Sequence, residues 1–210
     1  MVAPPLLQVQ GLAKHYRRGL LRRQTTFSLG AEFAVEAPTV VGVLGPNGSG
    51  KTTLFELITG SNLPSAGRVL VGGQDIHQVR PRERERLAVH YHQSYQVRSF
   101  RRRKPDWLLA RAAQAAPLVH LFDEPQFNPQ DGYIGFMLDF FARLRREGRL
   151  VFLCLHPNES YHIDILRESC ERFLFVQKGV VREMPDFKSV MADAQVRAYL
   201  GALAPAAAAA

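Results

Sequence analysis

The sequence predicts an α/β fold, in which a mainly parallel sheet is flanked by helices and carries an antiparallel β element near the N-terminus. Three observations support this class. The apolar run VVGVL at 40–44 leads through glycines into a segment of helical periodicity, which is typical of a strand–turn–helix unit. Apolar strands alternate with amphipathic helices in the rest of the chain. The segment FSLGAEFAV, which precedes this pattern, alternates apolar and polar residues as a half-buried antiparallel strand does.

Each expected strand has its own signal, either an alternation of apolar and polar residues or an uninterrupted apolar run. Before residue 100 these segments lie at 6–9, 25–35, 40–44, 68–71 and 87–92. After it, the run LVHLF follows Pro117 and another run lies at 150–155. Two short runs, at 173–176 and 180–182, flank a turn at Lys178–Gly179 and predict a hairpin.

Helices are expected where apolar residues recur every three or four positions. The first follows the glycines, with Leu54, Leu57 and Ile58 on one face. A polar helical piece is expected at 80–86 and further helices at 107–116, at 133–147, after His156, and in a last segment through Leu200. The helix at 133–147 has the clearest apolar face: Phe136, Leu138, Phe140, Phe141 and Leu144.

The length of 210 residues and the 46% hydrophobic content fit one domain with an ordinary core. We expect a single domain at 1–203 and a low-complexity alanine-rich tail at 204–210. Cys154 and Cys170 lie in apolar surroundings without metal or redox spacing, which indicates structural thiols in a reducing cytosol. No apolar run reaches 18 residues and no signal peptide is recognisable, so a cytoplasmic protein that meets a membrane only through a partner is expected.

The formal net charge is +8, which favours contact with anionic surfaces such as phosphates, nucleic acid or lipid headgroups. The excess is concentrated in four clusters: Arg17–Arg23, Arg80–Arg86, Arg98–Lys104 and Arg143–Arg149. The second alternates with glutamates and the fourth ends a predicted helix, so both are expected to be solvated or dipole-complementing faces. Contact with an anion stays open for the first and the third.

The segment GPNGSGKTT at 45–53 follows the pattern G-x-x-x-x-G-K-S/T between a strand and a helix, which predicts a loop that binds phosphates. Its glycines let the backbone turn successive N–H groups towards an anion. Lys51 is expected to reach the outer phosphates, and the Thr52 hydroxyl is suited to Mg²⁺ at the positive end of the following helix. A glycine-rich turn without a ligand would not explain the strand and the amphipathic helix that flank it.

Polar side chains stand at the ends of three further apolar strands. Asp123 and Glu124 end the strand after Pro117, Gln93 follows the strand at 87–92, and His156 follows that at 150–155. Ligands bind at this end of the strands in doubly wound sheets. Neighbouring side chains on a strand point in opposite directions, so one carboxylate is expected to hold Mg²⁺ and the other to polarise a water.

The order GPNGSGKTT, Gln93, LFDEP and His156 resembles that of the nucleotide-binding subunit of ABC transporters, a P-loop NTPase, over residues 6–201. The segment CERFLFVQKGVVRE resembles the family's hairpin after the histidine. The segment RAYLG resembles the C-terminal end of several importer and lipid-exporter ATPases. The resemblance implies that the chain binds ATP with Mg²⁺ and hydrolyses it to ADP and phosphate.

The resemblance also implies a role for each site residue. Tyr16 would stack on adenine, Glu124 would be the general base, and His156 would contact the γ-phosphate. Thr52 and Gln93 would ligate Mg²⁺, and Asp123 would hold it through water. The phosphates would be held by Gly45, Pro46, Asn47, Gly48, Ser49, Gly50, Lys51, Thr52 and Thr53.

The sequence departs from the family between Gln93 and Asp123. The family places a helical subdomain and an LSGGQ signature there, whereas this chain leaves 30 positions and has SFRRR at 99–103 where the signature would stand. Family members form dimers in which each ATP also contacts the signature of the other subunit. A heterodimer with a signature-bearing ATPase is therefore favoured over a homodimer. Phosphate contacts from Arg101–Arg103 in place of the signature stay open as an alternative.

Three functions stay open. The first is an ATP-hydrolysing subunit of a transport complex that has a membrane permease, located on the cytoplasmic face of a membrane through its partner. The second is a nucleotide-gated regulatory module with little hydrolysis of its own. The third is a soluble ATPase acting on nucleic acid, which has the least support because no basic face interleaved with aromatic residues accompanies the charge.

Overall fold

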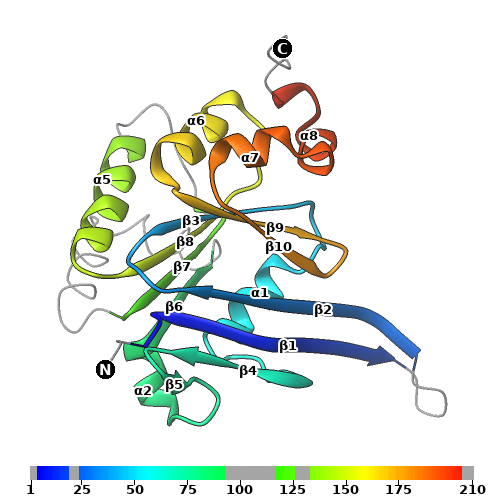
Figure 1. The fold of residues 1–210 in the computed structure, drawn as a ribbon, viewed down its shortest axis with the longest axis vertical. Helices are drawn as coiled ribbons and strands as arrows, with labels where there is room; N and C mark the ends of the chain where they lie inside the picture. The colour runs from blue at the N-terminus through cyan, green and yellow to red at the C-terminus, as the bar shows by residue number, and fades with distance from the viewer. Residues whose placement is uncertain (1–3, 19–23, 93–116, 126–132, 205–210) are drawn as a thin grey trace, which may run out of the picture.

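The computed structural model describes residues 4–18, 24–92, 117–125 and 133–204, and it confirms the predicted α/β class (Figure 1). The strands are β1 (Leu7–Arg18), β2 (Gln24–Val35), β3 (Val40–Leu44), β4 (Ala66–Val71), β5 (Gln74–Asp75), β6 (Ala88–His92), β7 (Val119–Asp123), β8 (Leu150–Cys154), β9 (Arg172–Gln177) and β10 (Val180–Met184). The helices are α1 (Lys51–Ile58), α2 (Pro81–Leu87), α5 (Tyr133–Arg146), α6 (Ser160–Ser169), α7 (Phe187–Ala192) and α8 (Ala194–Leu200), followed by the short 3₁₀ helix η2 (Gly201–Leu203).

The strands form one mixed sheet in the order β5-β4-β1-β2-β10-β9-β3-β8-β7-β6. Strands β5, β4, β1 and β2 pair antiparallel, which confirms the predicted N-terminal antiparallel element. Strands β9, β3, β8, β7 and β6 are parallel to one another, and β10 joins the two halves by pairing with β9 and β2. The carboxyl ends of β3, β8, β7 and β6 therefore share one edge.

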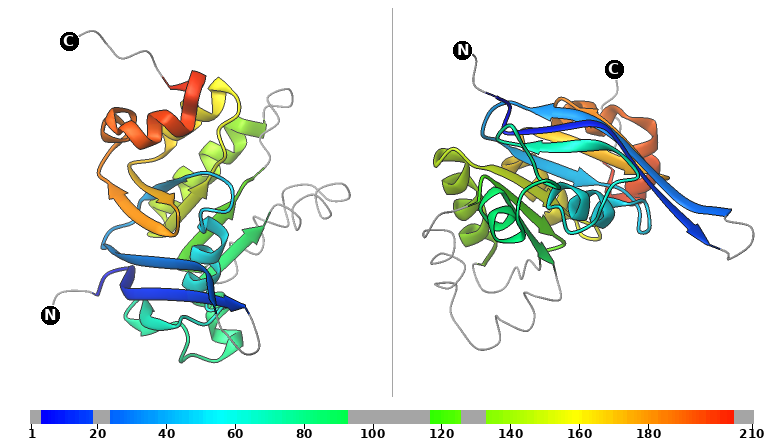
Figure 2. Two further views of the ribbon diagram at one scale, coloured as in Figure 1. Left: turned by 90° about the vertical axis from the view of Figure 1, so that its right-hand side faces the viewer. Right: turned by 90° about the horizontal axis from the view of Figure 1, so that it is seen from below.

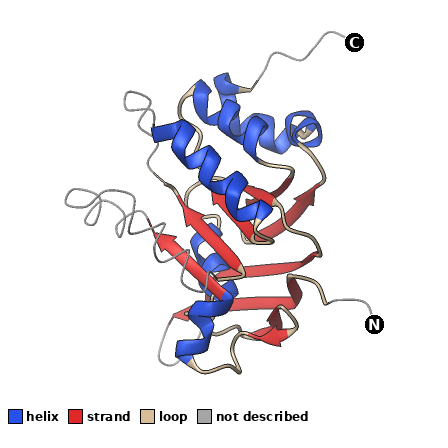
Figure 3. Ribbon diagram, turned by 90° about the vertical axis from the view of Figure 1, so that its left-hand side faces the viewer, coloured by secondary structure: helices blue, strands red, loops and turns tan. Residues whose placement is uncertain are grey.

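Both faces of the parallel strands are covered. Helix α1 belongs to one hydrophobic cluster with residues of β1, β2, β4 and β8, whereas α5, α6, α7 and α8 belong to a second cluster on the opposite face (Figures 1 and 3). Strand β8 supplies alternate residues to the two clusters: Phe152 belongs to the first, and Val151 and Leu153 to the second. Burial on both faces explains why this strand is apolar throughout.

Strand β1 is longer than the sequence predicts. Its signal of alternating residues ends at residue 9, but the strand continues to Arg18 through the basic segment that was expected to be a connection. Pairing with β2 extends it, with Tyr16 opposite Phe27 and Arg18 opposite Gln24. Figure 2 shows this ribbon projecting beyond the rest of the sheet, so its side chains are exposed and lack the apolar pattern of a packed strand.

The other differences are small or lie outside the described residues. The predicted helix at 107–116 and the SFRRR segment belong to the part of the chain that the structure does not describe. Cys154 and Cys170 are buried free thiols, consistent with a structural role. Among the described helices, none has both the length and the apolar character that a membrane crossing requires.

Candidate functional site

The phosphate-loop segment connects β3 to α1 and is tightly confined by its neighbours. Gly45 has φ 146° and an added Cβ would lie 2.0 Å from the carbonyl oxygen of Val176. Gly50 has φ 113° and an added Cβ would lie 2.6 Å from the Leu29 side chain. Both the backbone angles and the lack of space therefore require glycine at these two positions. These two glycines of the motif are therefore required by the packing of the loop against Val176 and Leu29, in addition to any role in binding a ligand.

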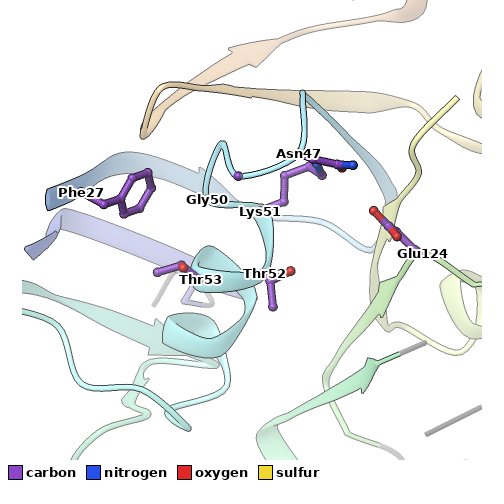
Figure 4. Close-up of a pocket in the computed structure, with 8 residues that line it drawn as sticks. Phe27, Asn47, Gly50, Lys51, Thr52, Thr53 and Glu124 are labelled. Atoms are coloured by element: carbon purple, nitrogen blue, oxygen red, sulfur yellow. The ribbon is translucent and has the colours of Figure 1, made fainter. Parts of the chain in front are cut away.

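This loop opens into a cavity of about 410 Å³ (Figure 4). Gly48, at the tip, has no atom within 4 Å of the position that a Cβ would take, so the loop is open where it faces the cavity. The lining residues come from β2, from the loop and the start of α1, and from the end of β7: Phe27, Asn47, Gly48, Gly50, Lys51, Thr52, Thr53 and Glu124. Segments that are far apart in the sequence therefore line the same cavity.

Lys51 begins α1 and keeps its charged end inside the loop. Its Nζ donates to the carbonyl oxygens of Gly45 at 2.7 Å and Pro46 at 3.0 Å, and the residue is only 6% exposed. An ammonium group that is buried requires such partners, because desolvating an unpaired charge is costly. The positive charge is therefore held at the floor of the cavity where the predicted phosphates would lie.

Asp123 joins the end of β7 to the start of α1. The Thr52 hydroxyl donates to Asp123 Oδ2 at 2.9 Å, and His90 Nε2 lies 3.3 Å from the same oxygen. Burial alone would raise the pKa of this carboxyl, but the hydrogen bonds from His90 and Thr52 outweigh it, so the pKa falls below its usual value. Asp123 is thus an anion at neutral pH although it is buried.

Glu124 follows directly and faces the cavity from the opposite wall to Thr52, as Figure 4 shows. Its N–H donates to the carbonyl oxygen of Cys154 at 3.0 Å, which continues the pairing of β7 with β8 beyond the strand. Its φ of 50° is left-handed, an arrangement that costs a non-glycine residue about 1–3 kcal/mol. The backbone strain turns the Glu124 side chain away from the path of β7 and into the cavity.

His156 follows β8 and is tied to the C-terminal helix α8. The hydroxyl of Tyr199 lies 3.0 Å from His156 Nδ1, and the two ring centroids are 5.9 Å apart. Burial raises the pKa of Tyr199 above its ordinary value, so the group is a neutral phenol at physiological pH. The histidine also follows Leu155, whose N–H donates to the carbonyl oxygen of Val43 in β3 at 3.3 Å, so it lies near the strand that leads into the loop.

The predicted adenine contact lies in the exposed ribbon. The Tyr16 hydroxyl accepts a hydrogen bond from Asn62 Nδ2 at 2.7 Å, and its ring centroid lies 6.2 Å from that of Phe27. Lys14 Nζ lies 5.1 Å from the centroid of the Tyr16 ring. Phe27 itself lines the cavity. An aromatic surface is thus present beside the loop, and the stacking role of Tyr16 stays a prediction.

Of the four strand-end residues that the sequence singles out, the structure brings three close to the loop. Asp123 bonds to Thr52, Glu124 lines the cavity, and His156 follows Leu155, which bonds to Val43 near the end of β3. Gln93 lies outside the described residues. Three residues that contact the site were not predicted from the sequence: Phe27, His90 and Tyr199. Phe27 belongs to no motif, Tyr199 was noted only as part of RAYLG, and His90 is a single histidine in an apolar strand.

The residues that are present fit a phosphate and a hard divalent cation. Within the described part of the chain, Ser49 Oγ is a buried polar atom without a hydrogen-bond partner, next to the open face of the loop. The Thr52 hydroxyl and the Asp123 carboxylate are oxygen donors of the kind that Mg²⁺ prefers. No three His, Cys, Asp or Glu side chains among the described residues form a metal-binding group.

Comparison with known proteins yields one family. Residues 29–105 match the family described as "ABC transporter". The chain is 38% identical over 86 residues to the lipopolysaccharide export system ATP-binding protein LptB of Acidithiobacillus ferridurans, an alignment that covers 41% of this chain and 33% of that protein. It is 48% identical over 59 residues to the cytochrome c biogenesis ATP-binding export protein CcmA of Escherichia coli, with 28% of each chain covered. The chain therefore matches about a third or less of the length of these relatives.

The similarity in fold to solved structures extends over a much larger part of this chain than the sequence matches do. A crystal structure of a nucleotide-free ATP-binding cassette from an ABC transporter superposes with a TM-score of 0.72 and 17% identity, over 93% of this chain and 98% of that one. A dimeric ATP-binding cassette in a post-hydrolysis state, bound to ADP and Pi, superposes with a TM-score of 0.63 and 17% identity, over 85% of this chain and 98% of that one. At such identity the likeness concerns the fold alone.

Proposed function

We propose that this chain, whose residues 29–105 match the ABC transporter family, is an ATP-binding and ATP-hydrolysing subunit of a transport complex. The observation that carries this proposal is the 2.9 Å hydrogen bond from Thr52 to Asp123, with Glu124 across the same cavity. It joins a phosphate loop to the acidic end of a neighbouring strand. Phosphoryl transfer requires this arrangement, since its catalysis depends on positioning and on neutralising charge.

Each proposed role uses a group with a suitable environment. The loop from Gly45 to Thr53 holds the phosphates. When the nucleotide binds, the Lys51 ammonium group exchanges its hydrogen bonds to the Gly45 and Pro46 carbonyl oxygens for hydrogen bonds to the outer phosphates. Thr52 and Gln93 would ligate Mg²⁺, and Asp123 would hold it through water. The ion would supply positive charge that neutralises the phosphates. Glu124 orients a water as general base, His156 contacts the γ-phosphate, and Tyr16 contacts adenine.

The family match also motivates a proposal about partners. The relatives named above are ATP-binding proteins of export or biogenesis systems. We propose that residues 1–203 form one nucleotide-binding domain that works with a membrane permease at the cytoplasmic face of a membrane. The sequence SFRRR stands where the family's signature would stand, so a second ATPase subunit would supply the missing signature.

Nucleotide binding by the purified chain tests the proposal. Lys51→Ala removes a charge at the floor of the cavity and is expected to lower the affinity for ATP with Mg²⁺ by on the order of 10- to 100-fold, as measured by titration calorimetry. Lys188→Ala, at an exposed position of α7, is the matched control and should bind as the wild type does. Equal affinities of the Lys51→Ala variant and the wild type would remove the central assignment.

A further inference from the structure

His90 of β6 lies beside the carboxylate of Asp123. Its Nε2 is 3.3 Å from Asp123 Oδ2, and the same oxygen accepts a hydrogen bond from the Thr52 hydroxyl at 2.9 Å. The side chains of His90 and Asp123 are only 14% and 5% exposed, so water competes little for this contact. One carboxylate oxygen is therefore contacted by two side chains that come from different elements, β6 and α1.

The pairing of β6 with β7 explains why His90 faces Asp123. The two strands are parallel, and His90 lies opposite Leu121. Alternate residues of a strand share a face, so Leu121 and Asp123 point to the side on which His90 lies. Between these positions, Tyr91 stacks on Phe122 on the other face, with 4.6 Å between the ring centroids. The contact therefore follows from strand register.

The imidazole ring of His90 is also fixed by its packing. The ring of Phe55 in α1 meets it edge to face, with 5.5 Å between the centroids and 89° between the planes, and Phe55 has no exposed surface. Such an arrangement is favourable for aromatic pairs. Turning the His90 ring away from Asp123 would break this contact, so the nitrogen keeps its place beside the carboxylate.

The direction of the hydrogen bond follows from the charge of the acceptor. Asp123 is ionised at neutral pH, because its pKa lies below the ordinary value. An ionised carboxylate has lone pairs but no proton to donate. His90 Nε2 must therefore carry a proton and donate it, as the Thr52 hydroxyl does.

We propose that His90 is a positioning residue, which holds the Asp123 carboxylate in the orientation that suits a divalent cation at Thr52. The inference rests on the proposed function, which assigns the cation to this pair. A carboxylate that is already held by two donors loses less freedom when the cation binds, and such supporting partners contribute to metal affinity. The residues that line the cavity, as far as the structure describes it, do not include His90.

The contribution of the cation to nucleotide affinity is the quantity that His90 should change. Titration calorimetry of the full chain with a non-hydrolysable ATP analogue, once with Mg²⁺ and once with EDTA, gives this contribution as the ratio of two affinities. His90→Phe keeps a ring beside Phe55 and removes the donor. We expect it to lower the ratio by on the order of 10-fold and to leave the affinity in EDTA unchanged.

Two further variants separate the lost donor from a general disturbance of the strand. His90→Gln offers an amide N–H in place of the imidazole and should recover most of the wild-type ratio. His77→Gln is the matched control, because His77 Nδ1 also lies near a carboxylate oxygen, that of Asp75 at 3.6 Å, after β5. This variant should keep the wild-type ratio.

A positioning role also requires that the effect depend on Asp123. In an Asp123→Ala background, His90→Phe should lower the ratio no further, since no carboxylate is left to hold. A wild-type ratio in His90→Phe, an equal loss in EDTA, a loss in His90→Gln as large as that in His90→Phe, or an additive loss in the Asp123→Ala background would overturn the proposal. The absence of any Mg²⁺ effect on the wild type would overturn it together with the cation assignment, whereas intact ATP binding by Lys51→Ala would overturn the proposed function itself.

Discussion

At the scale of single residues, His120 shows how the core restricts protonation. It lies in β7 with no exposed surface, stacked on Tyr91 and Phe122 with centroids 5.9 and 6.3 Å away. The Tyr91 hydroxyl lies 3.1 Å from its Nδ1, and its Nε2 has no partner among the described residues. Burial, assisted by the charge of Arg149, lowers the pKa of His120 from 6.5 to about 4. The imidazole is therefore a neutral part of the core.

This shift predicts an acid-sensitive stability. The unfolded chain binds a proton at His120 below pH 6.5, but the folded chain does so only near pH 4, so the free energy of unfolding falls as the pH is lowered between these values. The loss attributable to His120 is about 2 kcal/mol at pH 5. In His120→Phe, which keeps a stacked ring, the decrease between pH 7.5 and pH 5 should be smaller by this amount in urea denaturation. An unchanged decrease would contradict the assignment.

At the scale of elements, the turn between β9 and β10 supports the phosphate loop. The Gly179 N–H donates to the carbonyl oxygen of Ser49 at 3.0 Å, and the Gly30 N–H of β2 donates to the carbonyl oxygen of Gly179 at 2.7 Å. Gly179 has φ 76°, and an added Cβ would lie 1.7 Å from the Ser28 carbonyl oxygen. The hairpin is thus fixed between the loop and the antiparallel half of the sheet.

Gly179→Ala should therefore affect both stability and ligand binding. The new methyl group would collide with the backbone of β2 in addition to straining φ, and a loss on the order of 1–3 kcal/mol in the free energy of unfolding is expected. ATP affinity should fall as well, because Ser49 belongs to the loop. Gly148→Ala is the control: its φ is 82°, but no atom lies within 4 Å of the new Cβ, so only strain is added. Equal effects of the two variants, without a change in ATP affinity, would argue against the supporting role.

At the scale of the whole molecule, the sheet brings the proposed catalytic groups to one edge. The antiparallel half carries Tyr16 and Phe27, the parallel strands carry Asp123, Glu124 and His156, and β3 leads into the phosphate loop between them. A partner would approach this edge to complete the proposed ATP site. The segment that would carry the signature belongs to the part of the chain outside the described residues.

If the chain needs a second ATPase subunit, ATP hydrolysis should depend on the presence of that subunit. Affinity capture of the chain from native membranes should recover a permease and a second ATPase, and phosphate release should rise when the captured partner is added to the purified chain. Glu124→Gln should reduce this activity by on the order of 100- to 10,000-fold and preserve ATP binding, since a general base acts in the transition state. Glu147→Gln, at the exposed end of α5, should retain the activity.

Full activity in the Glu124→Gln complex would refute the role of this residue as general base. Full activity of the purified chain without any partner would refute the partner requirement. ATP binding without hydrolysis, even in the captured complex, would favour a nucleotide-gated regulatory module instead.

Local patterns were sufficient for most of the described elements and for the position of the glycine-rich loop. The glycines of GPNGSGKTT, the apolar runs before Gly45 and Asp123, and the hairpin turn at Lys178–Gly179 each depend on a few neighbouring residues, so the sequence predicts them directly. The extension of β1 to Arg18 was missed, because an exposed strand held by pairing with β2 lacks an apolar pattern.

The sequence by itself determined that a glycine-rich loop between a strand and a helix precedes an acidic strand end and a histidine, because each of these features depends on neighbouring residues. Only the tertiary structure decided which side chains those groups meet: His90 on Asp123, Phe27 at the cavity, and Tyr199 on His156. These contacts join residues far apart in the sequence, such as His156 and Tyr199, which are 43 positions apart. Their formation depends on strand order and helix packing, which no local pattern specifies.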